Sequence, residues 1–104
     1  MNNQVTINNK PKFSVAIQSD MYKNLINNTL GDPERAKRFV ASISSAVAIN
    51  SALQECDAKT VLSGALLGEA LELSPSPQLG LFYLVPYNNK NGGKDAQFQL
   101  GLAI

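Results

Sequence analysis

The hydrophobic period of this chain changes at residues 74–77, Ser-Pro-Ser-Pro, and this change restricts the folds that the chain can adopt. Before this point, apolar residues recur at the i, i+3, i+4 spacing of amphipathic helices. After it, residues 79–86 and 96–100 alternate with a period near two, as strands do, and the polar stretch 88–95 is expected to be a loop. The sequence therefore predicts an α+β fold, in which two to three helices form an N-terminal layer before a β-hairpin. Because the first strand is apolar on both faces, we expect the hairpin to be part of a larger mixed sheet.

Each expected helix starts at a residue whose side chain can accept a backbone N–H. These N-caps are Ser19 or Asp20, Asp32 and Asp57. Gly31 should stop the first helix, and Pro33 suits the first position of the second helix because a missing N–H costs nothing there. The second helix should end between residues 49 and 53, and the third at Pro75.

The apolar positions of these helices predict the faces that pack inward. Met21, Leu25 and Ile26 should do so in the first helix, and Ala36, Phe39, Val40, Ile43, Val47 and Ala48 in the second. Gly64 and Gly68 lie one turn apart in the third helix, and this spacing allows another segment to approach closely. The run 13–17 fits either a short extended piece or the approach to a helix.

Composition sets the domain organisation and excludes several classes of function. We expect residues 1–12 to be a flexible tail and residues 13–104 a single domain. The net charge of +1 provides no bulk attraction for nucleic acid. With no histidine and Cys56 as the single cysteine, zinc sites and Cys/His or Ser/His/Asp catalysis lack their residues, so neither an enzyme nor a cofactor or metal is expected. A cytoplasmic protein without membrane contact is expected, since no signal pattern or long apolar run occurs.

Two candidate chemical features have plainer explanations. Glu69 and Glu72 could share a helix face as an acid–base or metal-binding pair, although a solvated helix end explains them equally well. Cys56 precedes a helix and could be a reactive thiol, but a small buried cysteine is commoner. Neither feature indicates a reaction.

The loop and the residues around it offer a different kind of site. The stretch 88–94, NNKNGGK, lacks the arrangement of a phosphate-binding P-loop, so it is either a solvated hairpin loop or a flexible basic finger. Aromatic and amide side chains flank it, as in proteins that bind single strands by stacking, but burial in the core would also explain the aromatics. They are Tyr83, Tyr87, Phe98, Gln97 and Gln99.

The ordered motifs from residue 57 to residue 101 resemble those of the RecT-type phage single-strand DNA annealing proteins. A leucine-rich helix is followed by a Pro, Leu-Gly, aromatic, Pro-Tyr run, a glycine-lysine loop and a Gln-rich strand that ends in Leu-Gly. The residues that occupy the family's positions are Glu72, Leu73, Pro75, Leu79, Gly80, Tyr83, Pro86, Tyr87, Gln97, Gln99, Leu100 and Gly101.

This resemblance implies ATP-independent binding of single-stranded DNA and annealing of complementary strands in phage or prophage recombination. The active form would be a homo-oligomer along the DNA, with a phage exonuclease and a host single-strand-binding protein as possible partners. Lys90 and Lys94 would neutralise phosphates, Tyr87 would stack on a base, and Gln97 and Gln99 would make polar contacts. The alternative from a different class is a protein-interaction or oligomerisation module that does not itself bind DNA.

The resemblance also raises two expectations about length. Family members are longer, so we expect this chain to be the N-terminal portion of an annealing protein. In the family an aromatic–lysine–glycine segment usually follows Gln-Leu-Gly, whereas Leu102 follows Gly101 directly here. We therefore expect residues to be missing between Gly101 and Leu102.

Overall fold

The computed structural model describes residues 12–73 and 80–101. Within these ranges the expected α+β arrangement is confirmed, because helices precede a two-stranded antiparallel sheet. The larger mixed sheet stays a prediction, and the tail at residues 1–11 and the Gly101–Leu102 junction are not covered by the description. The elements are α2 (Phe13–Ala16), α3 (Asp20–Leu30), α4 (Pro33–Ile49), the 3-10 helix η1 (Ser51–Glu55), α5 (Ala58–Ala70), β1 (Phe82–Asn88) and β2 (Lys94–Leu100).

Local hydrogen bonds explain where the helices begin and end. Ser19, Asp32 and Asp57 each accept a backbone N–H from the first turn of the next helix, at 3.3, 3.1 and 3.1 Å. Gly31 ends α3 in the left-handed conformation, at φ 72°. α4 ends at Ile49, inside the predicted range. These sequence predictions are confirmed, and the run after residue 12 forms the short helix α2.

The end of α5 differs from the prediction. The helix stops at Ala70, before Pro75, which lies in the segment without description. The Leu73 N–H donates to the Gly68 carbonyl at 2.9 Å and the Glu72 N–H to the Glu69 carbonyl at 3.0 Å, while Glu72 has φ 60°. This is a Schellman motif with glutamate at the position that glycine usually takes.

The inward face of α3 also differs. Ile26 is buried as expected, but Met21 and Leu25 are 66% and 44% exposed, and Tyr22 is buried in their place. Met21/Leu25 and Tyr22/Ile26 are two overlapping i, i+4 pairs, about 100° apart around the helix axis. Packing of α3 against α4 selects the second pair, which buries the aromatic ring.

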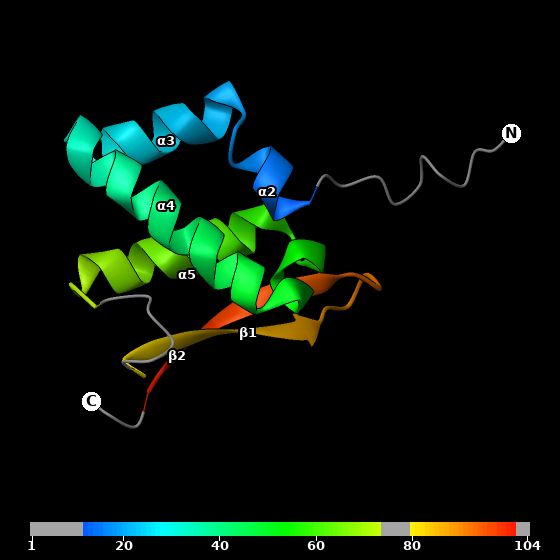
Figure 1. Ribbon diagram of the computed structural model, residues 1–104. Coiled ribbons are helices and arrows are strands. Elements are labelled where there is room, and N and C mark those ends of the chain that lie inside the picture. The colour runs from blue at the N-terminus through cyan, green and yellow to red at the C-terminus, as the bar shows by residue number, and fades with distance from the viewer. Residues whose placement is uncertain (1–11, 74–79, 102–104) are drawn as a thin grey trace, which may run out of the picture.

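α5 lies between the other helices and the hairpin, and it packs against both strands (Figure 1). The side chains that are almost completely buried come from four of the helices, so the core joins the helical layer to α5. They are Phe13, Ile26, Ile43, Val47, Val61 and Leu62. In α4 the predicted stripe is buried or half-buried except at its last position, Ala48, which is exposed.

The predicted close approach at the glycine pair is confirmed, but side chains make it instead of a second backbone. A Cβ built on Gly64 would lie 2.6 Å from Leu84 Cδ2, and one built on Gly68 would lie 2.5 Å from Phe82 Cζ. Phe82 also stacks on Phe98, with ring centroids 5.1 Å apart. The two glycines therefore let the inner face of the hairpin sit directly on α5.

The start of α5 covers part of the outer edge of β2. The Asp57 N–H donates to the Lys94 carbonyl at 2.8 Å, and the Ala96 N–H donates to Thr60 Oγ1 at 2.9 Å. The same Thr60 hydroxyl donates to the Asp57 carbonyl at 2.7 Å. These contacts fix the position of the hairpin relative to the helix.

Candidate nucleic-acid interface

The hairpin has one face against α5 and one face that no other described element covers. Side chains of successive strand residues alternate between the faces, so Phe82 and Leu84 point inward, where both are buried. The other face carries three cross-strand pairs. They are Tyr83 opposite Gln99, Val85 opposite Gln97, and Tyr87 opposite Asp95.

This outer face holds exposed aromatic rings beside exposed amides. Tyr83 and Tyr87 are 46% and 47% exposed, and Gln97 and Gln99 are exposed as well. The prediction that both glutamines share a face is confirmed, and Tyr87 joins them there. Half-exposed tyrosine rings can stack on nucleic-acid bases, and amide groups can donate to or accept from bases and sugars. The structure thus brings three of the five candidate residues together and adds Tyr83.

Lys94 lies elsewhere, and its expected place in the loop is wrong. It is the first residue of β2, opposite Asn88, so alternation puts it in phase with the inner face. Its carbonyl accepts the Asp57 N–H, and its ammonium group acts on the thiol of Cys56. The period-two pattern of the second strand extends two residues further toward the loop than the sequence analysis allowed.

The loop is shorter than expected because Asn89 closes it. Its side-chain Oδ1 accepts the N–H groups of Asn91 and Gly93 at 2.9 and 3.0 Å, and its Nδ2 donates to Asp95 Oδ1 at 3.1 Å. The connection between the strands is therefore residues 89–93 alone, tied by one side chain. Lys90 is exposed in this loop.

A groove of about 520 Å³ runs between α5 and β2, and two of the candidate residues border it. It brings Lys59, Thr60 and Ser63 from α5 close to Tyr87 and Gln97. Sequence reasoning missed these α5 residues, because exposed polar positions on a helix look like an ordinary solvated face. The full lining is Lys59, Thr60, Ser63, Gly64, Leu67, Tyr87, Ala96, Gln97 and Phe98.

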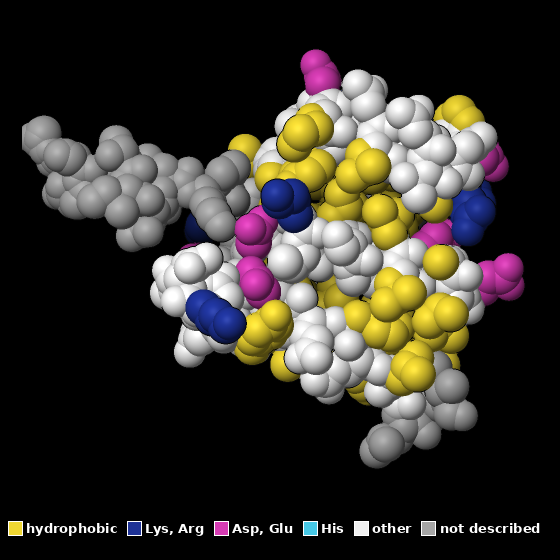
Figure 2. Space-filling view, turned by 180° about the vertical axis from the view of Figure 1, so that it is seen from behind, with side chains coloured by type: hydrophobic (Ala, Val, Ile, Leu, Met, Phe, Trp, Pro, Cys, Tyr) yellow, Lys and Arg dark blue, Asp and Glu magenta, His cyan; other side chains and the backbone are white. Residues whose placement is uncertain are grey.

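Charges on the visible surface are interspersed. Figure 2 shows Lys and Arg side chains near Asp and Glu side chains on one face, without a continuous basic patch. On the outer face of the hairpin, Asp95 adds a carboxylate beside Tyr87. Any phosphate contact in the described part of the chain must therefore come from single cations such as Lys59 and Lys90.

The carboxylates and the cysteine show no arrangement for a reaction. Glu69 accepts a hydrogen bond from Arg35 Nε at 2.7 Å, forming an ion pair between α5 and α4, and Glu72 lies in the turn after α5. Cys56 is buried, and burial raises the pKa of its thiol, with a smaller effect of Asp95 in the same direction. A raised pKa is opposite to that of a reactive thiolate. In residues 12–73 and 80–101 no three His, Cys, Asp or Glu side chains gather as metal ligands.

None of the described helices combines the length and the apolar character needed to cross a membrane.

Comparison with known proteins identifies the family. The model of the RecT family matches residues 37–103. The "Uncharacterized protein YqaK" of Bacillus subtilis (strain 168) is 43% identical over 68 residues, which is 65% of this chain and 22% of that protein. The chain thus spans about a fifth of the length of this relative, and no solved structure matches. The family match covers more than half of the sequence and includes α5 and both strands, so the chain belongs to the RecT family.

Proposed function

We propose that this chain binds single-stranded DNA and contributes to ATP-independent annealing of complementary strands in homologous recombination. Two exposed tyrosines beside two exposed glutamines, on the uncovered face of a hairpin in a RecT-family chain, carry the proposal. The contact surface would be this outer face together with the groove between α5 and β2. The chain would make and break no covalent bond.

Stacking gives the outer face its use. Tyr83 and Tyr87 are separated by two positions on one strand, so their side chains lie about 7 Å apart along the same face. Every base has a π-face, so stacking on tyrosine holds DNA of any sequence at about 1 to 3 kcal/mol per base. Gln97 and Gln99 face the same side and can hydrogen-bond to bases or sugars without a charge. This combination suits a protein that must hold a strand of any sequence.

Lysines at the two ends of the surface would hold the phosphates. Lys59 borders the groove and Lys90 lies in the loop, so they stand on either side of Tyr87 along a possible strand path. Lys94 would reach phosphates only from the other side of the hairpin. Because few cations are involved in this part of the chain, the salt dependence of its binding should be modest.

The wider biological setting belongs to the same proposal. We infer a phage or prophage recombination protein of the cytoplasm that assembles as a homo-oligomer along DNA. An exonuclease that supplies single strands and a host single-strand-binding protein would be its partners. Support comes from membership of the RecT family.

The test is direct binding followed by annealing. Fluorescence anisotropy with a labelled single-stranded oligonucleotide, at two salt concentrations, should show binding that weakens with salt, and added complementary strand should be annealed. Tyr87→Ala should weaken binding by about tenfold or more, as expected for one lost stacking contact. Leu25→Ala is the matched control, since it removes an exposed side chain on α3, remote from the hairpin.

Two results would contradict the proposal. One is a folded chain that shows no salt-sensitive binding, which would favour the alternative of a protein-interaction module. The other is a Tyr87→Ala variant that binds as tightly as the unchanged chain.

A further inference from the structure

The outer edge of β1 is the counterpart of the β2 edge that α5 covers, and its backbone groups have a defined direction. The Gly101 N–H donates to the Leu81 carbonyl at 2.8 Å, and the Asn89 N–H donates to the Gly93 carbonyl at 2.9 Å. In an antiparallel pair, hydrogen-bonded positions alternate with positions whose backbone groups point away. The odd-numbered residues of β1 therefore bond to β2, and the even-numbered residues turn their N–H and C=O groups toward the outer edge.

These outward groups find no partner among the residues that the structure describes. They include the N–H and C=O groups of Phe82 and Leu84 and the carbonyl of Pro86. Pro86 occupies an outward position, where its missing N–H costs no ladder bond. An unpaired edge of this kind is a template for another strand.

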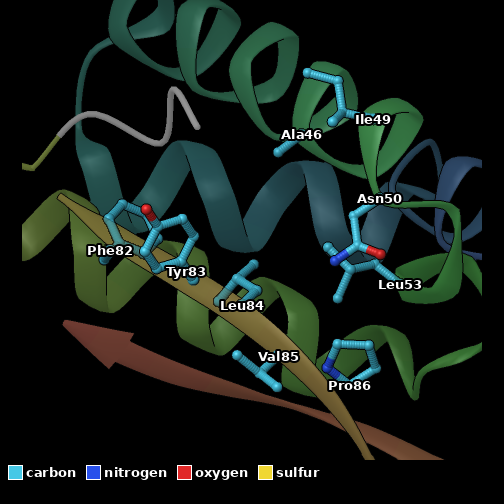
Figure 3. Close-up of a pocket in the computed structure, with 9 residues that line it drawn as sticks. All are labelled: Ala46, Ile49, Asn50, Leu53, Phe82, Tyr83, Leu84, Val85 and Pro86. Atoms are coloured by element: carbon cyan, nitrogen blue, oxygen red, sulfur yellow. The ribbon is translucent and has the colours of Figure 1, made fainter. Parts of the chain in front are cut away.

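The edge lies at the bottom of an apolar groove of about 370 Å³, with the end of α4 and η1 as the opposite wall (Figure 3). Ile49 and Leu53 come from that wall, and Ile49 is 65% exposed. The full lining is Ala46, Ile49, Asn50, Leu53, Phe82, Tyr83, Leu84, Val85 and Pro86. An occupant therefore meets apolar side chains on one side and backbone donors and acceptors on the other.

The wall restricts what can enter. A strand of a second hairpin carries its own covering helix on one face, and that helix would collide with α4 and η1. A single extended segment with apolar residues at alternate positions has no such cover. The groove therefore selects a linear segment over the edge of another folded sheet.

The chain itself contains such a segment close by. Residues 4–8, Gln-Val-Thr-Ile-Asn, alternate polar and β-branched apolar side chains, which is a strand pattern. α2 is anchored to the groove wall, because the Ser14 N–H donates to Gln54 Oε1 at 3.1 Å and α2 packs on η1. From Lys12, four to eight residues reach roughly 13 to 27 Å, and a pairing partner for residues 82–86 needs about 16 Å.

We propose that residues 4–8 add to the outer edge of β1 as a third strand of the same molecule. Val5 and Ile7 would point to Ile49 and Leu53, while Thr6 would point to the open side. The carbonyls of the segment would accept the N–H groups of Phe82 and Leu84. Tethering through α2 makes this an intramolecular event, so a short segment suffices. The inference stands apart from DNA binding, since it concerns the opposite edge from the groove of α5 and β2.

Hydrogen exchange of the full chain, followed by NMR at the Phe82 and Leu84 amides, tests the proposal. In the unchanged chain both amides should exchange slowly, and the double variant Val5→Asn, Ile7→Asn should accelerate them by about tenfold or more. Thr6→Asn is the matched control, because it changes the open side of the same segment and should leave the rates unchanged. Exchange at Val61, in the core, reports that each variant stays folded.

Two outcomes overturn the proposal. The first is equal exchange at Phe82 and Leu84 in the unchanged chain and the double variant. The second comes from mixing the isotope-labelled double variant with excess unlabelled, unchanged chain. If slow exchange returns in the labelled chains, the segment acts between two molecules and not within one.

Discussion

Gly68 of α5 lies directly against the ring of Phe82, and the contact leaves no space for a methyl group. A Cβ at Gly68 would fall 2.5 Å from Cζ and 2.6 Å from Cε1 of that ring. The ring cannot move freely, because Phe98 stacks on it. The helix therefore keeps a glycine that is unfavourable for its own stability in order to seat the hairpin.

Gly68→Ala should lower the free energy of unfolding by about 1 to 3 kcal/mol, since overpacking outweighs the gain of up to about 1 kcal/mol in helix propensity. Chemical denaturation measures the change. Ser63→Ala is the control, because it makes a similar change at an exposed position of α5 and should be neutral or slightly stabilising. Equal effects of the two substitutions would mean that the hairpin adjusts without cost.

Glu72→Gly should stabilise the chain. Glu72 has a left-handed φ of 60°, which costs a residue with a side chain about 1 to 2 kcal/mol. Glycine removes this cost but adds flexibility to the unfolded chain, so the net gain should be up to about 1 kcal/mol and raise the Tm by several degrees. Leu71→Gly, at the preceding position with φ −87°, should destabilise instead. A lower Tm for Glu72→Gly would contradict the Schellman assignment.

Lys59→Ala should weaken binding of single-stranded DNA and flatten its salt dependence by about 0.7 in the log–log slope for one lost phosphate contact. Titrations at several salt concentrations give the slope. Lys94→Ala is the matched comparison, because it removes the same charge from the inner-face side of the hairpin and should leave the slope unchanged. A reversed result would place the DNA on the other side of the hairpin.

Stability should fall at alkaline pH, partly through Tyr22. Burial raises the pKa of its phenol above the ordinary value of 10.0, and Asp57 adds a smaller effect in the same direction. The folded chain thus holds this proton more tightly than the unfolded chain. Its contribution is complete below pH 10 and is lost as the pH rises through the raised pKa. Urea unfolding from pH 8 to 11 should show a smaller loss for Tyr22→Phe than for Tyr83→Phe, and equal losses would remove Tyr22 as a cause.

The parts of the fold that depend on neighbouring residues could be predicted from the sequence. Ser19, Asp32 and Asp57 cap helices through hydrogen bonds that span only two or three residues, so local patterns suffice to find them. The period-two alternation likewise placed Gln97 and Gln99 on one face. The family resemblance was also available at this level, and the family match confirms it.

The errors came from choices that tertiary packing makes. Nothing local separates Met21/Leu25 from Tyr22/Ile26 as the inward pair, and contact with α4 decides it. The side chain of Asn89 sets the loop boundary through bonds across the turn, so Lys94 became a strand residue. Lys59 gained its interest only when folding placed it beside Tyr87. The candidate surface was therefore half predictable, in its hairpin and not in its helix.

The bonds from Asp57 and Thr60 to Lys94 and Ala96 also bear on how the chain folds. They join segments more than thirty residues apart, and one of them uses an amide at the start of α5. The first turn of α5 and the first residues of β2 thus complete each other's hydrogen bonding. Formation of the hairpin and nucleation of α5 should then be one cooperative event, and neither should open in the native state without the other.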